Sequence, residues 1–234
     1  MLPKLVSRRI SPRNIALLDK VAGIEPGAVS LHATDLDGAG YARLAHFLGE
    51  HGNLVRILKL QPSQGFYGRG ELQHIDFAAS CPNLRALDVK RVAFNESVFA
   101  HPALTDLCLR ESEYCGGRSI AVDREQPLRR LEFVDCRVKA DTLAIAADSG
   151  IKTFRYYLDE DYAEACPDNF GVYGKSLEEI TIDACWAYTV TTDWASQRHN
   201  RYRTFRAGQY GNVTHVYYGG DGDRVVREYG PQDG

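Results

Sequence analysis

The chain of 234 residues lacks the signatures of several protein classes. It has no block of Lys and Arg, and its formal net charge is only −3, which argues against a nucleic-acid footprint and a basic membrane patch. The sequence contains no run of about 18 apolar residues, the length needed to cross a bilayer. No apolar run of about 7–15 residues follows the basic start, as a secretory signal requires. We therefore expect a cytoplasmic protein that binds neither nucleic acid nor membrane.

Catalytic and metal-binding motifs are also missing. HExxH, GxSxG and GxGxxG do not occur, and the seven histidines have no ligand spacing. Gly174-Lys175-Ser176 lacks the upstream glycine of a phosphate-binding loop, because Asn169 occupies that position. The six cysteines form no CxxC pair, so we interpret them as buried thiols. A triad assembled from distant residues stays open, but the sequence predicts a protein that is not an enzyme and needs no metal or cofactor.

What the sequence does contain is a repeat. Apolar residues return at positions one, four and six of a short segment, which predicts strands whose fourth and sixth residues face the core. The copies are the pair Val29-Leu31, then Val55-Leu58-Leu60, Leu84-Leu87-Val89, Leu104-Leu107-Leu109, Leu128-Leu131-Phe133, Ile151-Phe154-Tyr156, Leu177-Ile180-Ile182, Tyr202-Phe205-Ala207 and Val213-Val216-Tyr218. With fourth positions at 29, 58, 87, 107, 131, 154, 180, 205 and 216, every interval except the last is 20 to 29 residues.

This pattern resembles the leucine-rich repeat family. In that family a small polar residue follows three positions after the last strand apolar, where the chain turns and its backbone amides face inward. Cys136 and Cys185 occupy this position, and Thr34 and Ser112 are looser versions. A small polar side chain there can satisfy the amides. We therefore predict a structural role for Cys136 and Cys185.

The resemblance implies an α/β fold: a leucine-rich repeat solenoid with one curved parallel sheet, helices on the convex side of some repeats, and a C-terminal β-hairpin cap. The first repeats are similar to the ribonuclease-inhibitor-like subtype. Leu44, Phe47 and Leu48 share one face of an expected helix, and further helices are expected over 71–80 and 140–148. Only a turn fits over 95–100.

We expect a single domain over residues 1–234. Residues 1–24 would form an N-terminal helical cap, in which Ser11 and Pro12 open a helix over 13–21. Residues 25–207 would hold the repeats, and 208–234 a hairpin of 213–218 with 224–229. Aromatic residues are abundant from Phe154 onward, which indicates either bulky packing or a second contact patch in the last third.

Residues at positions three, five and seven of each strand would form the concave surface. Their charges alternate in sign, with aromatic residues between them, which fits a protein partner better than nucleic acid or a small substrate. The candidate partner-binding residues are Lys59, Asp88, Lys90, Asp106, Arg110, Arg130, Glu132, Arg155, Tyr157, Glu179, Asp183, Arg206 and Tyr217. We expect charge reversal at Arg130 or Arg155 to weaken partner binding and leave stability nearly unchanged.

The functional hypothesis is a non-catalytic protein–protein interaction scaffold. One form of it is an inhibitor or immunity-type protein that occludes a toxin or enzyme with its concave face. Two alternatives stay open. One is a carbohydrate-active enzyme on a parallel β-solenoid, using carboxylates such as Asp88, Glu132 and Asp183, and the other is a repeat module of a larger assembly.

Overall fold

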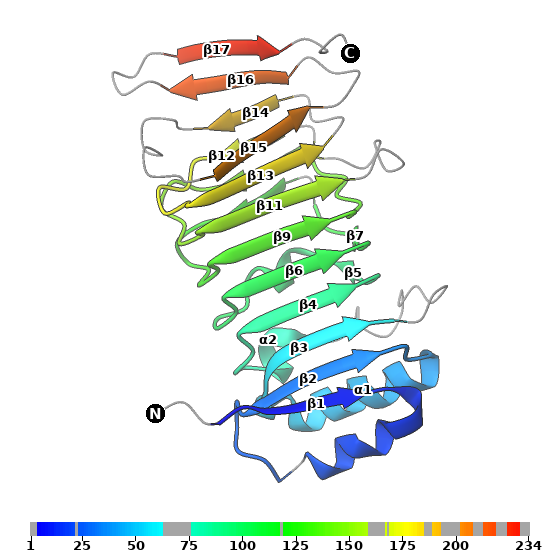
Figure 1. Cartoon of the computed structure of the whole chain (residues 1–234). Helices are drawn as coiled ribbons and strands as arrows, with labels where there is room; N and C mark the ends of the chain where they lie inside the picture. Colours follow the sequence, from blue (N-terminus) through cyan, green and yellow to red (C-terminus); the bar gives the residue numbers. More distant parts are fainter. Residues whose placement is uncertain are drawn as a thin grey trace. The chain divides into compact units, whose positions relative to one another are not determined.

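The computed structural model (Figure 1) describes residues 4–21, 23–62, 76–117, 119–158, 167 and 169–184, and the strands 189–192, 202–207, 213–218 and 224–229. For those four strands, and for residues 169, 183 and 184, the description covers the backbone only. The chain divides into two compact units, residues 1–115 and 116–234.

The first unit is built on five parallel strands. In order across the sheet these are β1 (Val6–Ile10), β2 (Val29–Thr34), β3 (Val55–Gln61), β4 (Ala86–Lys90) and β6 (Asp106–Arg110). The residues at the predicted fourth and sixth positions of β3, β4 and β6 are buried, from Leu58 to Leu109. Leu87 lies opposite Leu107, as the repeat pattern predicts. Alternation along each strand therefore separates a core side from a strand face, the side that carries positions three, five and seven.

Helices in the described residues belong to the first unit. They are the 3-10 helix η1 (Pro12–Lys20), α1 (Gly38–His51), the 3-10 helix η2 (Gly52–Leu54), α2 (Phe77–Ser80) and the 3-10 helix η3 (Glu96–Val98). The expected helix around Leu44, Phe47 and Leu48 is confirmed as α1, which begins after Asp37 because its carboxylate accepts a hydrogen bond from the Gly40 amide. Of the helix expected over 71–80, residues 71–75 lie outside the described part.

The N-terminal segment differs from the expected helical cap. Ser11 and Pro12 do open a helix, but it is a 3-10 helix, and the strand β1 comes before it. The sequence pattern does not predict β1, because Arg8 lies between Val6 and Ile10 on the core side and hides the alternation.

The second unit contains two sheets between which the chain alternates. The first holds β9 (Arg130–Val134), β11 (Thr153–Leu158), β13 (Glu179–Ala184) and β15 (Tyr202–Ala207), all parallel. The other holds β8 (Ser119–Val122), β10 (Thr142–Ile145), β12 (Asn169–Val172), β14 (Thr189–Thr192) and β16 (Val213–Tyr218), with β17 (Arg224–Tyr229) antiparallel to β16. The Tyr156 ring on β11 packs edge-on against Phe170 on β12, with centroids 4.9 Å apart, so the core lies between the sheets.

The helix expected over 140–148 is wrong, because this segment contains strand β10. Leu143 and Ile145 are fully buried and alternate with the half-buried Thr142 and Ala144. This is the two-residue period of a strand, with a β-branched residue at each end. The hairpin expected from 213–218 and 224–229 is confirmed as β16 and β17.

Two of the predicted strand registers are also wrong. Leu31, and not Val29, lies opposite Leu58, so the first repeat interval is 27 residues (31 to 58). Apolar residues alternate along β2, so the pattern fits two registers equally, and a bulge follows Val29. On β15 Phe205 lies opposite Ile182 and not Ile180.

Two backbone features recur at equivalent places in the repeats. The residue after β2, β4, β6 and β9 has a left-handed φ, at Asp35 (55°), Arg91 (58°), Glu111 (44°) and Asp135 (52°). Non-glycine residues seldom adopt this conformation, so its recurrence marks a common turn.

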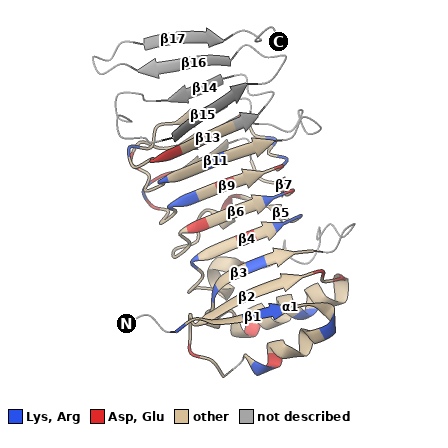
Figure 2. Ribbon diagram, in the orientation of Figure 1, with Lys and Arg blue, Asp and Glu red and all other residues tan. Residues whose placement is uncertain are grey.

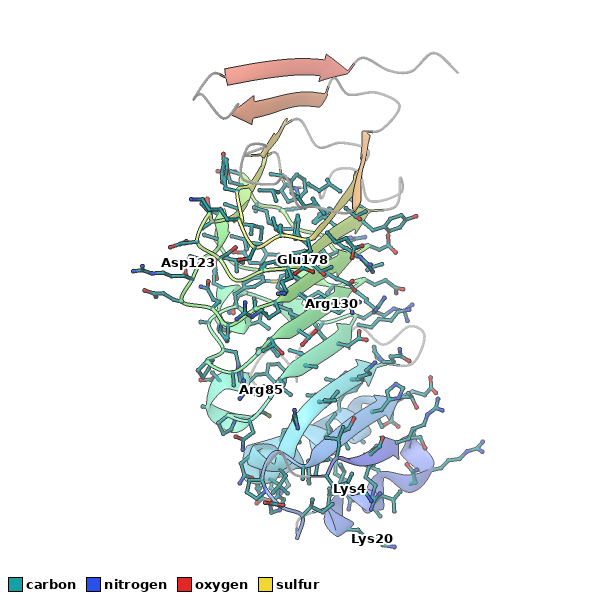
Figure 3. All side chains as sticks on the ribbon, turned by 60° about the vertical axis from the view of Figure 1, so that its left-hand side comes forward. Lys4, Lys20, Arg85, Asp123, Arg130 and Glu178 are labelled. Carbon is teal, nitrogen blue, oxygen red and sulfur yellow. The ribbon has the colours of Figure 1, made fainter. Side chains whose placement is uncertain are left out.

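The second recurring feature precedes the strands. The carbonyl of Arg85 accepts the amides of Thr105 and Asp106, and the carbonyl of Arg129 accepts two successive amides in the same way. Each arginine also donates from Nη1 to a carbonyl of the following turn, at 3.2 Å, to Ala103 and Gly150 respectively (Figure 3 labels Arg85).

A buried histidine joins two successive turns of the first unit. His101 Nε2 lies 3.1 Å from the Cys81 carbonyl, while Nδ1 accepts a hydrogen bond from the Ala103 amide at 3.1 Å. This arrangement requires the neutral imidazole with its proton on Nε2. Burial lowers the pKa of His101, against smaller opposing effects of backbone hydrogen bonds and Asp76.

The described residues form an α/β structure with few helices and mostly parallel strands. None of their helices has the length and apolar character needed to span a lipid bilayer.

Candidate protein-binding surface

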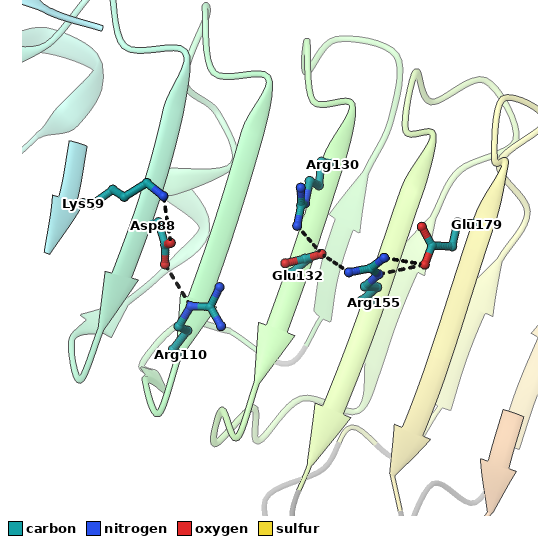
Figure 4. A network of polar contacts seen from close by, with 7 residues as sticks. All are labelled: Lys59, Asp88, Arg110, Arg130, Glu132, Arg155 and Glu179. Carbon is teal, nitrogen blue, oxygen red and sulfur yellow. Dashed lines mark hydrogen bonds and ion pairs between the residues drawn. The ribbon is translucent and has the colours of Figure 1, made fainter. Parts of the chain in front are cut away.

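The strand face of the first unit carries an ion-pair cluster on three neighbouring strands. Lys59, Asp88 and Arg110 come from β3, β4 and β6 (Figure 4). Arg110 Nε donates to Asp88 Oδ1 at 2.9 Å, and Lys59 Nζ lies 3.9 Å from Asp88 Oδ2. The contact of Lys59 is at the outer limit of an ion pair, and its side chain is half exposed. Lys59 therefore keeps hydrogen-bonding capacity for another molecule.

A second cluster lies at the carboxyl ends of β4 and β6. Glu111 accepts from Lys90 Nζ and Arg91 Nε, each at 2.6 Å. Burial acts to raise the pKa of Glu111, but hydrogen bonds and charges from Lys90 and Arg91 outweigh it and hold the pKa below its ordinary value. The predicted site residue Lys90 is thus committed to an internal pair. At the other end of β6, Asp106 accepts a hydrogen bond from the Thr105 hydroxyl at 2.7 Å.

The second unit has a longer cluster, drawn in the same close-up (Figure 4). Glu132 Oε1 accepts from Arg130 Nη2 at 2.8 Å and from Arg155 Nη1 at 3.1 Å. Arg155 also donates from Nε (2.8 Å) and Nη2 (2.6 Å) to Glu179 Oε1. Hydrogen bonding to Glu179 is the main cause that raises the pKa of Arg155. Glu132 is only 4% exposed, because it lies between the two arginines.

The two arginines of this cluster differ in their remaining donors. Arg155 uses all three guanidinium nitrogens, so it holds the cluster together. Arg130 uses Nη2 for Glu132, and its side chain is half exposed. Beside them on β11, Tyr157 is 45% exposed and lies opposite Val134 of β9. Arg130 and Tyr157 are therefore the side chains of this face best able to contact a partner.

Three predicted site residues have side chains outside the described part of the chain. Asp183 and Arg206 are opposite each other on β13 and β15, and not at the offset positions that the repeat pattern predicts. The prediction that Tyr217 lies on the same face as the other candidates is wrong, because β16 belongs to the other sheet of its unit.

Two residues of the strand face are missing from the predicted set. Arg9 of β1 and His32 of β2 continue the row of Lys59, since Arg9 lies opposite His32 and His32 opposite Lys59. The repeat pattern would have predicted His32 if Leu31 had been assigned to the fourth position of its strand, because His32 would then occupy the fifth position. Arg9 requires β1 itself to be recognised.

The turn residues and cysteines have structural contacts. Ser112 Oγ accepts the Val92 amide at 3.2 Å and donates to the Arg110 carbonyl at 2.7 Å, as expected of a polar turn residue. Cys136 is fully buried, and its sulfur contacts the Val134 carbonyl at 3.5 Å. Burial raises the pKa of Cys81 to about 12.

The other predicted turn cysteine, Cys185, lies outside the described residues. Within the described residues, no three His, Cys, Asp or Glu side chains are grouped so that they could hold a metal ion.

No protein-family model, curated protein or solved structure matches the chain. Its function is therefore inferred from the side chains of the strand face.

Proposed function

We propose that the protein is a non-catalytic, leucine-rich-repeat-like solenoid that binds another protein through its strand face, which would be the concave side. An inhibitor or immunity-type protein that occludes a toxin or enzyme is the specific form of this proposal. Cys81 is a buried thiol, which supports action in the reducing cytoplasm.

The repeated backbone geometry supports the solenoid. Left-handed residues follow four strands, and Arg85 and Arg129 make the same carbonyl and guanidinium contacts in different repeats. Equivalent turns with equivalent hydrogen bonds are what stacked structural repeats require.

The observation that carries the binding proposal is the ordered, mixed-charge strand face. Its paired side chains are held in fixed positions before any partner arrives, which lowers the entropy lost on binding. Arg130 and Tyr157 are exposed on this face, and Arg and Tyr are among the residues that contribute most to protein interfaces.

The enzyme alternative has one observation in its favour, because the two mostly parallel sheets of the second unit suit a β-solenoid. Against it, Asp88 and Glu132 are both occupied by cationic partners. A glycoside hydrolase needs two carboxyl groups free to act as acid and base on either side of the substrate, and these paired carboxylates do not provide them.

The test is affinity capture from an extract of the source organism, followed by calorimetry with the captured protein. We expect the double variant Arg130→Gln/Tyr157→Ala to bind at least tenfold more weakly, about 1.4 kcal/mol. The control Lys139→Gln, at an exposed residue outside the strand face, should bind like the wild type. A partner retained by the double variant and lost by the control would refute the proposal. Polysaccharide hydrolysis abolished by Glu132→Gln would establish the enzyme alternative instead.

A further inference from the structure

One end of the first unit's strand face carries a row of basic side chains. Arg9, His32 and Lys59 occupy directly opposed positions on β1, β2 and β3. Neighbouring strands are about 4.8 Å apart, so the row is about 10 Å long. The core residues Ile10, Leu31, Ala33, Leu58 and Leu60 alternate with them, which places the three basic side chains on the strand face.

No acidic residue shares this face within β1, β2 and β3, all of whose residues are described. The other residues of the face are Ser7, Ser30, Thr34, Ile57 and Gln61. The nearby acids in sequence lie elsewhere: Asp35 follows the end of β2, and Asp37 caps α1. Basic residues on β1 and β3 are visible in Figure 2, whereas β6 and β13 begin with acidic residues. The row is thus a local positive region in a chain of net charge −3.

The charges of the row are weakly compensated. Arg9 is exposed, and among the described residues Lys59 has only its 3.9 Å contact with Asp88. A second observation is that His32 Nε2 is buried and has no hydrogen-bond partner in the described part of the chain. Buried polar atoms are rarely left unpaired, and each such case needs an explanation. A carboxylate held by Arg9 and Lys59 would draw these side chains toward itself and offer His32 an acceptor.

We propose that the row Arg9–His32–Lys59 binds carboxylates of an acidic segment of the partner protein. The inference rests on the proposed function and adds to it the chemistry of the partner. A nucleic acid would require a longer basic surface to neutralise several phosphates, and the face beyond β3 is of mixed charge. Opposed charges would increase the association rate and select partners with an acidic patch.

The probe for the test is a fluorescein-labelled peptide of ten glutamates, with a peptide of ten glutamines as the neutral control. Fluorescence anisotropy should show binding of the glutamate peptide only, with an affinity that falls as salt increases. The double variant Arg9→Gln/Lys59→Gln should bind at least tenfold more weakly. The matched control Lys20→Gln/Lys139→Gln removes two exposed charges elsewhere and should stay within twofold of the wild type.

Equal affinities of the two double variants would overturn the proposal. Tighter binding of oligothymidylate or polyphosphate than of the glutamate peptide would also overturn it, by assigning the row to phosphate. The single variant Lys59→Met provides the comparison if the double variant does not fold, because the contact of Lys59 with Asp88 is long, at 3.9 Å. The glutamate-peptide assay could fail while the variant Arg130→Gln/Tyr157→Ala still loses binding to the partner. This result would reject the role of the basic row and leave the proposed function intact.

Discussion

Reversing the charge of Arg155 should destabilise the protein, contrary to what the sequence alone leads us to expect. Arg155 is the only residue of its cluster that contacts both acids, Glu132 and Glu179. The variant Arg155→Glu removes three contacts of at most 3.1 Å and introduces a third carboxylate between these two. Because Glu132 is buried, it cannot turn into water to avoid the new charge.

The size of the effect follows from the geometry. Removing one partner of a buried ion pair costs about 3–5 kcal/mol. Glu132 keeps Arg130 at 2.8 Å, and Arg155 is 44% exposed, so this contribution should lie below that range. Repulsion between carboxylates about 4 Å apart is up to about 4 kcal/mol at an effective dielectric constant of 20, before the introduced side chain turns toward solvent. We expect a net loss of about 2–4 kcal/mol, and a smaller loss of about 1–2 kcal/mol for Arg155→Met.

Urea denaturation followed by circular dichroism measures this loss, and a thermal melt should shift downward by about 2–4 °C per kcal/mol. The matched control is Arg124→Glu, because Arg124 and Asp148 form a 3.8 Å pair in which both side chains are more than half exposed. Exposed pairs contribute about 0–1 kcal/mol, so this variant should be nearly as stable as the wild type. Equal stability of Arg155→Glu and Arg124→Glu would show that the buried cluster does not form in solution.

Three further predictions follow from single positions. Gly52→Ala should cost about 1–3 kcal/mol, because the added methyl would clash with the Ser80 carbonyl oxygen. Gly49→Ala should stabilise α1 by about 0.5–1 kcal/mol in the same urea assay, because the added methyl meets none of the described residues outside the helix's own turns. The pKa of His101 is lowered by folding, so below pH about 6.5 the unfolded chain binds a proton that the folded chain excludes, and stability should fall as the pH drops. The slope should reach at most about 1.4 kcal/mol per pH unit, and His101→Gln should flatten it in urea titrations between pH 8 and 5. At Asp35, whose φ is 55°, replacement by Gly should preserve or raise the melting temperature, whereas Asp35→Val should cost about 1–2 kcal/mol; equal melting temperatures would contradict the left-handed turn.

The sequence predicts the strands of the large parallel sheet well where apolar residues recur without ambiguity. Leu131, Phe154 and Ile180 are directly opposite their neighbours, because each copy has a single fit to the pattern. On β2 the alternation of Val29, Leu31 and Ala33 allows two fits, and only pairing with β3 decides between them.

The second sheet of the 116–234 unit was hidden for a different reason. Its strands are short, and β8 and β10 each contribute only two buried apolar residues, such as Leu143 and Ile145. Such short apolar patterns do not distinguish a strand from one face of a helix. The ion pairs of the site could not be predicted from the sequence either. Charges on neighbouring strands indicate a shared face, but they do not show which side chains pair with one another.

Whether a charged side chain is already paired within the chain determines how it could contribute to binding a partner. Glu132 and Arg155 are satisfied within the chain, so a partner that used them would first have to break contacts of 2.6–3.1 Å. Such a partner would regain little, because the net contribution of exchanging one ion pair for another is small. No internal contact has to be broken to use the exposed donors of Arg130 and Lys59 or the exposed ring of Tyr157, since these already face solvent. The paired residues should therefore act as the rigid support of the surface, and binding energy should come from the side chains that the clusters leave exposed.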